Sequence, residues 1–345
     1  MIGQRLRRSR LPVALVAVAA AAGTVLAGGA AHAAPAEPKD FAKAGRAAQA
    51  RLNDLHGQTR AGVAKRLATD ELNFGDLDGD GKADLAAIDS SGRLWVYPGR
   101  ATVYAGTGTR PTSHFAARFE VGSGWNKFTE LVRHGDWNND GRQDILGRDA
   151  QGRLIFYAGT GTRPGVVRNG VQIGTGWNPY LDIVGIGDAD GDGFDDLMGR
   201  RDGALVVYFG TGNVTVPFRK TTLTVGSSWN GSLLTTIGDW NGDSHTEYLF
   251  RATNGEVRLY WSRADGFPDN GPAVIFEAED GPYVRNLVGM GNLTSDAVID
   301  GQPVTQPLPD IIVQDVDGWL VALAPDVEDD FDPVVGNGWS GFRTF

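Results

Sequence analysis

The segment Gly187–Leu197, GDADGDGFDDL, places five carboxylates within eleven residues. Counted from Asp188, aspartates occupy positions 1, 3, 5 and 9, and Phe194 at position 7 offers its main-chain carbonyl. Alternate side chains of a tight loop can converge on one point, and a set of oxygen ligands suits a hard cation such as Ca²⁺. Carboxylates this close repel one another unless a cation lies between them. The pattern therefore predicts a calcium site, with Asp195 pointing to solvent; solvated Asp-Gly turns without metal are the alternative.

The same pattern recurs along the chain. Comparable segments begin at Gly75, Gly135 and Gly238, so the first four loops start 60, 52 and 51 residues apart, and a decayed fifth follows after 53 more. The predicted ligands are Asp76, Asp78, Asp80, the Lys82 carbonyl and Asp84 in the first loop; Asp136, Asn138, Asp140, the Arg142 carbonyl and Asp144 in the second; Asp188, Asp190, Asp192, the Phe194 carbonyl and Asp196 in the third; and Asp239, Asn241, Asp243, the His245 carbonyl and Glu247 in the fourth. The fourth loop has Ser244 where the others have glycine, and the fifth, around Asn292, has lost its ligands. We expect three calcium sites and a possible fourth.

Each acidic loop introduces the same run of strands and turns. A short apolar segment such as Leu85–Ile88 follows the loop, and a turn containing Ser-Gly, Gln-Gly, Asp-Gly or Asn-Gly leads into a second strand such as RLWVY. Asn-Gly and Asp-Gly between apolar runs indicate hairpins. About four short strands per unit of roughly 50 residues are typical of a β-propeller blade. We therefore expect an all-β protein, a five-bladed propeller over residues 72–345.

The two ends of the repeat region complement each other. The last unit stops at Phe345, at the point that corresponds to Leu131 in a complete unit. Residues 72–76, LNFGD, resemble the part that is missing there. The first and last residues are thus expected to complete one blade together, which would leave no open sheet edge.

A loop of nine residues between strands of a ~50-residue repeat resembles the FG-GAP (VCBS-type) repeat of integrin α-subunit propellers and many secreted bacterial proteins. An EF-hand is excluded, because it needs a glutamate at position 12 and a following helix, whereas Ala87, Gly147 or Gly199 stands there and a strand is expected. The resemblance implies an extracellular, calcium-stabilised propeller used for binding. Integrin propellers have seven blades, so a count of five departs from that pattern.

Two aromatic columns accompany the loops. Tryptophans follow a Gly-x-Gly or Gly-Ser-Ser sequence in four units, and tyrosines end the second hairpin strand; they are Trp125, Trp177, Trp229 and Trp339, and Tyr97, Tyr157, Tyr208 and Tyr260. Packing between blades is one interpretation. The other is that the tryptophans stack on sugar faces in a multivalent site, similar to fungal propeller lectins, with the loops Gly106–Arg110 and Gly159–Arg163 on the same rim.

The N-terminal region differs from the repeats. Residues 1–33 contain four arginines, a mostly apolar run and an A-x-A site, which predicts a cleaved secretory signal rather than a membrane anchor. Residues 34–71 are rich in Ala and Arg and predict a linker or capping helix, broken near Gly57 and Gly62, with a basic surface tether as the alternative. Removing residues 1–33 removes four positive charges and no acid, so the net charge changes from −10 to −14. Such an acidic chain is a poor nucleic-acid binder, and without cysteine it needs calcium rather than disulfides outside the cell.

Signals for catalysis are missing from the sequence. It has no G-x-S-x-G, no H-E-x-x-H and no cysteine nucleophile. We therefore expect a secreted, monomeric and non-catalytic binding module without stable membrane insertion. Its expected partner is an extracellular glycan; a protein-binding or structural role and, further off, a polysaccharide hydrolase with paired carboxylates are the alternatives.

Overall fold

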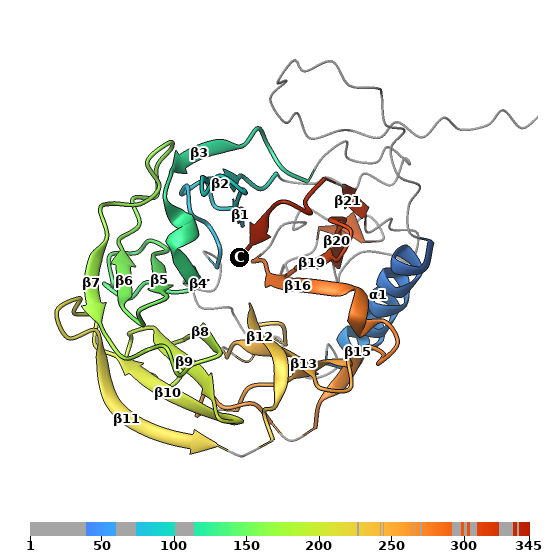
Figure 1. The fold of residues 1–345 in the computed structure, drawn as a ribbon. Helices are drawn as coiled ribbons and strands as arrows, with labels where there is room; N and C mark the ends of the chain where they lie inside the picture. Colours follow the sequence, from blue (N-terminus) through green and yellow to red (C-terminus); the bar gives the residue numbers. More distant parts are fainter. Residues whose placement is uncertain are drawn as a thin grey trace, which may run out of the picture.

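Five antiparallel sheets of four strands each stand in a ring around a central axis (Figure 1). The computed structural model describes residues 39–59, 74–100, 114–225, 228–323 and 334–345, apart from 242, 244, 264, 270, 292–297, 300–301, 304–308 and 337. The prediction of an all-β propeller with five four-stranded blades is confirmed. One helix, α1 (Lys39–Thr59), precedes the blades.

The first three blades follow one another in chain order. Blade 1 contains β1 (Leu85–Ile88), β2 (Leu94–Tyr97), β3 (Phe119–Gly122) and the last strand of the chain, β22 (Arg343–Thr344). Blade 2 contains β4 (Phe128–Val132), β5 (Ile145–Asp149), β6 (Leu154–Tyr157) and β7 (Val171–Gly174). Blade 3 contains β8 (Asp182–Gly187), β9 (Asp196–Arg201), β10 (Ala204–Gly210) and β11 (Phe218–Val225). A short 3₁₀ helix, η2 (Trp125–Lys127), links blades 1 and 2.

The last two blades repeat this order with one insertion. Blade 4 contains β12 (Gly231–Gly238), β13 (Glu247–Ala252), β14 (Val257–Tyr260) and β15 (Ala273–Phe276). Blade 5 contains β16 (Val284–Gly289), β19 (Ile311–Asp315), β20 (Leu320–Leu323) and β21 (Val334–Gly336). The 3₁₀ helix η3 (Gly281–Tyr283) links the two blades. A small hairpin of β17 (Val298–Ile299) and β18 (Gln302–Pro303) stands where the fifth acidic loop would be.

The ring is closed by its two chain ends, as predicted. Strand β22 pairs antiparallel with β1, so that Ala87 lies opposite Thr344 and Ile88 opposite Arg343. The innermost strand of blade 1 therefore comes from the C-terminal end and the other three from residues 85–122. In Figure 1 the C-terminus lies near the centre of the ring.

Apolar side chains fill the five spaces between neighbouring blades. Five clusters of buried residues occur, and each combines strands of two adjacent sheets. Between blades 2 and 3, for example, Leu146 and Phe156 meet Ile183 and Leu197. The strands are buried on both faces, which explains why β1, β5 and β19 read as continuous rather than alternating buried runs.

Helix α1 packs against the ring between blades 4 and 5, beside β15 and β20 (Figure 1). Ala44, Ala48 and Leu52 belong to the cluster between these blades. Arg51 donates to the Ile275 carbonyl at 2.7 Å and to Glu277 Oε1 at 2.9 Å. The helix continues to Thr59, so the expected break near Gly57 is wrong; docking of an apolar face stabilises a helix beyond its intrinsic propensity.

Several expectations fall outside the described residues. They include the signal at residues 1–33, the boundary at residue 71, the second helix break at Gly62, the loop Gly106–Arg110 and Asn292. Within the described part of the chain, α1 lacks the apolar length that a membrane-spanning helix needs, and it is the one helix there long enough to be considered.

Candidate functional site

The acidic loops are built by hydrogen bonds from their own main chain. In the third loop, Asp188 Oδ1 accepts from the Gly191 N–H at 2.8 Å and its Oδ2 from the Gly193 N–H at 2.8 Å. Glycines 191 and 193 both have positive φ, 77° and 88°, so the sharp turn needs them. Asp196 closes the loop, accepting from the N–H groups of Ala189 at 2.9 Å and Gly210 at 2.7 Å. The first aspartate thus folds the loop, and the ninth fastens it to the next strand.

The first and second loops have the same construction. Asp76 accepts from the Gly79 and Gly81 N–H groups at 2.7 and 2.8 Å, and Asp136 accepts from Gly141 at 2.6 Å. At position 9, Asp84 accepts from the Gly99 N–H at 3.1 Å. Asp144 accepts from the Gly159 N–H at 2.8 Å. The repeated spacing of the sequence is therefore a repeated loop geometry.

Three carboxylates converge in each of these loops. In each group one oxygen per residue lies within 4.8 Å of the others; the groups are Asp76, Asp78 and Asp84; Asp136, Asp140 and Asp144; and Asp188, Asp190 and Asp196. A separation of that size is what a single ion with oxygen ligands at 2.3–2.6 Å requires. Asp80 and Asp192 lie outside these groups, and the main-chain carbonyls of Lys82, Arg142, Phe194 and His245 stay a prediction.

Two buried oxygens test whether a cation fits. Asp78 Oδ1 in the first loop and Asn138 Oδ1 in the second are buried and have no hydrogen-bond partner. Both belong to position 3 of the predicted ligand set. A buried acceptor without a donor is costly, and a bound cation would satisfy it. The donor set, carboxylate and amide oxygens only, matches a hard ion such as Ca²⁺.

The ninth position carries the largest electrostatic cost. Burial, reinforced by the charge of Asp78, raises the pKa of Asp84 to about 8. Burial likewise raises the pKa of Asp144 to about 8 and that of Asp196 to about 7. Without a nearby positive charge these carboxylates are costly to ionise, so a cation in the loop would stabilise the ionised form.

Arginines contact two of the loops. Arg163, on the β6–β7 connection of blade 2, donates through Nε to Asp78 Oδ2 at 2.6 Å and through Nη2 to Asp80 Oδ2 at 3.2 Å. Arg219 in the third blade donates to Asp190 Oδ2 at 2.9 Å and also contacts Asp192. The position-5 carboxylates that lie outside the convergent groups thus face guanidinium groups. The loop Gly159–Arg163, expected to line a sugar-binding rim, instead reaches the acidic loop of the neighbouring blade.

In the fourth loop, the side-chain amide of Asn241 donates to two of the predicted ligands. Asn241 Nδ2 donates to Asp243 Oδ2 at 3.1 Å and to Glu247 Oε1 at 3.2 Å. Burial, with the charges of Asp239 and Asp243, raises the pKa of Glu247 well above its usual range. Among the described residues, this loop contributes no group of three acids as close as those of loops one to three. The fourth site stays a prediction.

The expectation that Asp195 points to solvent is wrong. Its Oδ2 accepts from the main-chain N–H of Asp136 at 2.5 Å, which joins the acidic loop of blade 3 to that of blade 2. Position 8 of the loop faces the preceding blade because it lies between loop and strand, where the sheets approach each other.

The two aromatic columns form one set of contacts. Each tryptophan lies beside the tyrosine of the next blade with ring centroids 4.6–4.8 Å apart; the pairs are Trp125–Tyr157, Trp177–Tyr208, Trp229–Tyr260 and Trp339–Tyr97. The tryptophans are only 5–9% exposed. The main-chain N–H of Trp177 also donates to the carbonyl of Gly152, in the hairpin turn of the preceding blade, at 3.0 Å. These contacts favour the packing interpretation, because the ring faces that a sugar would need lie inside the protein.

A further contact that recurs between the blades was not predicted from the sequence. Four residues after position 9, a buried or half-buried polar side chain donates to two main-chain carbonyls of the link to the next blade. Arg148 donates to the Trp177 and Tyr180 carbonyls, Arg200 to those of Trp229 and Gly231, Arg251 to those of Gly281 and Val284, and Gln314 to those of Trp339 and Phe342. We call these four residues the carbonyl clamp. The recurrence of arginine at 148, 200 and 251 was a signal that could have revealed it.

Comparison with known proteins agrees with this architecture. Residues 76–146 match the family model described as FG-GAP-like repeat. The matched segment contains the first two acidic loops, and together with the ring of five four-stranded blades it supports a propeller of FG-GAP-type repeats. No curated protein matches the chain.

Two solved structures illustrate how distant the structural relatives are. The BP39L lectin from Burkholderia pseudomallei is 13% identical with a TM-score of 0.38, over 74% of this chain and 66% of that one. BBS1N, in a complex with ARL6DN, is 10% identical with a TM-score of 0.33, over 77% of this chain and 68% of that one. The chain therefore spans about two thirds of the length of each.

Proposed function

We propose that the protein is exported and serves outside the cell as a calcium-stabilised, non-catalytic binding module. The observation that carries the calcium part is the convergence of three acidic residues within 4.8 Å in each of three loops. The unpartnered oxygens of Asp78 and Asn138 support it. Export would follow from the signal predicted at residues 1–33, and a cysteine-free chain would then rely on metal ions for extracellular stability.

Isothermal titration with Ca²⁺ tests this proposal. Three sites are expected, with dissociation constants on the order of 10⁻⁴–10⁻³ M, as for extracellular calcium modules. The matched control is the variant Asp202→Asn, because Asp202 is exposed in a hairpin turn outside the acidic loops. A protein that takes up no Ca²⁺ at millimolar concentration would contradict the proposal.

The non-catalytic part rests on how the acids are used. Acid–base hydrolysis of a glycan needs two carboxylates free to exchange protons with the substrate. In the loops, Asp76, Asp144 and Asp196 instead accept hydrogen bonds from main-chain N–H groups. Their common task is to fold the loop around a cation.

A glycan is the partner we propose, and a glycan array with the calcium-loaded protein tests it. Reproducible hits are expected. A protein partner is the second candidate, because Tyr283 and Val316 are 44% and 49% exposed and lie side by side, joined by the bond from the Val316 N–H to the Tyr283 carbonyl at 3.0 Å. A blank array would favour that alternative.

A further inference from the structure

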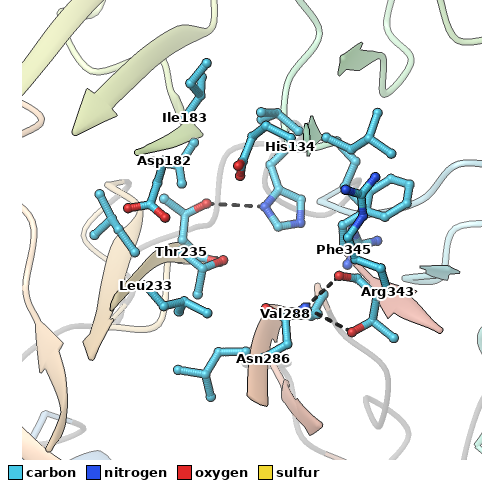
Figure 2. A pocket seen from close by; sticks show the side chains of 18 of the residues that line it. His134, Asp182, Ile183, Leu233, Thr235, Asn286, Val288, Arg343 and Phe345 are labelled. Atoms are coloured by element: carbon cyan, nitrogen blue, oxygen red, sulfur yellow. Dashed lines mark hydrogen bonds between the residues drawn. The ribbon is translucent and has the colours of Figure 1, made fainter. Parts of the chain in front are cut away.

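The innermost strands of the five blades enclose a cavity on the ring axis with a volume of about 390 Å³. It is lined by residues of β4, β8, β12, β16 and β22 (Figure 2). At roughly 30 Å³ for each water, the space corresponds to about a dozen waters, so it has room for a sugar ring together with waters around it. The calcium loops lie elsewhere, since none of their predicted ligands lines this cavity.

One level of the cavity is polar at four of its five positions. The residue six positions before the first loop aspartate lines it in every blade, and in blade 1 the C-terminal strand supplies the equivalent: Glu130, Asp182, Leu233, Asn286 and Thr344. Glu130 is surrounded by protein, yet 26% of its side chain is accessible. Figure 2 shows Asp182, Thr235 and Asn286 around the same space.

The two carboxyl groups at this level face guanidinium groups. Glu130 Oε2 lies 3.5 Å from Arg148 Nη2, and Asp182 Oδ2 contacts Arg200 Nε. Arg343 Nη1 donates to the Phe128 carbonyl at 2.7 Å. Both carboxyl groups thus have a guanidinium partner, and the guanidinium groups of Arg285 and Arg343, which also line the cavity, bond main-chain carbonyls, so that spare hydrogen-bonding positions are left on each. Such positions suit hydroxyl groups, which can donate to a carboxylate and accept from a guanidinium.

Apolar and buried polar groups complete the wall. Val132, Val184 and Val288 line the next level and offer a surface for C–H groups. His134 also lines the cavity, and its ring points into it in Figure 2. Nδ1 is 3.2 Å from Thr236 Oγ1, while Nε2 is buried and has no partner with hydrogen-bond geometry. The nearby Gly289 carbonyl already accepts from Arg133 at 2.8 Å.

We propose that this axial cavity binds one neutral, polyhydroxylated ring, a monosaccharide or the terminal sugar of a glycan. The inference rests on the proposed function as a glycan-binding module and locates its site. Glu130 and Asp182 would exchange hydrogen bonds with sugar hydroxyls, the valines would contact the C–H face, and His134 would accept or donate one bond at the inner end.

Ligand-observed NMR with the full chain in Ca²⁺ tests the proposal. The probes are D-glucose, D-galactose, D-mannose, D-xylose and L-arabinose, with sulfate and putrescine as anionic and cationic probes. At least one sugar is expected to show saturation transfer. The signal should disappear in Thr235→Trp, which fills the cavity, and persist in Thr215→Trp, a control at an exposed loop position of blade 3. Asp182→Asn should weaken sugar binding about tenfold, the loss of one to two hydrogen bonds.

Each other outcome has a defined meaning. Binding of sulfate or putrescine in preference to every sugar would contradict a neutral ligand. An absence of sugar signal in folded wild-type protein would contradict a sugar site in the axial cavity. Sugar binding that survives in Thr235→Trp would place the glycan elsewhere and leave the proposed function intact. Should Thr235→Trp not fold, as judged by its calcium-dependent melt, Leu233→Trp blocks the cavity at the adjacent level.

Discussion

Arg343 on the last strand donates to the carbonyl of Phe128 at 2.7 Å and takes the place of a missing member of the carbonyl clamp. In blade 1 the clamp position is Ile88, which cannot donate, and Ile88 pairs directly with Arg343 across β1 and β22. The Phe128 carbonyl corresponds to the Tyr180 carbonyl, which accepts from Arg148 at the next junction. The strand that closes the ring therefore also supplies the clamp that its blade lacks.

Removal of one clamp residue should be costly. Arg148→Met keeps much of the apolar stem but leaves the Trp177 and Tyr180 carbonyls without their donor, so the free energy of unfolding should fall by about 2–3 kcal/mol. Chemical denaturation measures this. Arg153→Met is the control, because its guanidinium pairs with Asp149 at 51% exposure and should change stability by no more than about 0.5 kcal/mol. Equal effects of the two variants would contradict a clamp.

Calcium removal should lower the melting temperature. At about ten times the dissociation constant, each site adds roughly 1.4 kcal/mol, so three sites add roughly 4 kcal/mol. At about 2–4 °C per kcal/mol, excess EGTA should lower the melting temperature by roughly 10 °C in scanning calorimetry. Asp84→Asn should lose part of this response yet match wild type in EGTA, because the buried charge that needs the cation is gone. An unchanged melt in EGTA would refute the stabilising role.

Arg163 should compete with the ion at the first loop. Its guanidinium contacts Asp78 and Asp80 and is 43% exposed, so the pair is worth no more than about 1 kcal/mol. Arg163→Gln is expected to tighten calcium binding at one site by up to about fivefold. Titration calorimetry can resolve the change, and Arg153→Gln serves as the control. Weaker binding in Arg163→Gln would mean that the arginine supports the loop rather than competes.

The tryptophans should behave as core residues. Trp177→Ala removes the stacking with Tyr208 and opens a cavity between blades 2 and 3, at an expected cost of about 3–5 kcal/mol. Tyr283→Ala, at an exposed aromatic, should stay within about 0.5 kcal/mol. If Trp177→Ala melted like wild type but lost glycan binding, the stacking-platform interpretation would be restored.

Glu130 should make the stability of the protein fall as the pH rises from acidic to neutral values. Burial, with the charge of Asp182, raises its pKa from 4.5 to about 8. Between these values the folded protein binds the proton and the unfolded chain does not, so the free energy of unfolding falls as the pH rises from about 4.5 to about 8 and levels off above it. Glu130→Gln should therefore melt a few degrees above wild type at pH 9 and like wild type near pH 4. Glu256→Gln, at a surface ion pair with Arg258, is the control. If the difference in melting temperature between Glu130→Gln and wild type were the same at pH 9 and at pH 4, this assignment would be contradicted.

The architecture was accessible from sequence because it is periodic. The loop spacing predicted the blades and the closure of the ring, and the apolar run Leu85–Ile88 predicted the bounds of β1. The carbonyl clamp was also periodic and could have been found. The axial cavity could not, since Glu130, Asp182 and Asn286 occupy one repeat position with different residue types, and only the closed ring brings them together. Arg163 was unpredictable for a related reason: its partners lie 83 and 85 residues away in another blade.

The junction between blades 4 and 5 has a mechanical consequence. Gly281 stands there in place of the tryptophan, and in blade 5 the hairpin β17–β18 replaces the acidic loop. Helix α1 docks at this junction. Because apolar clusters between neighbouring blades hold the ring together, a junction without the tryptophan depends on other contacts for its cohesion. The helix thus stabilises this junction, and amide hydrogen exchange along β15 should report how often the junction opens.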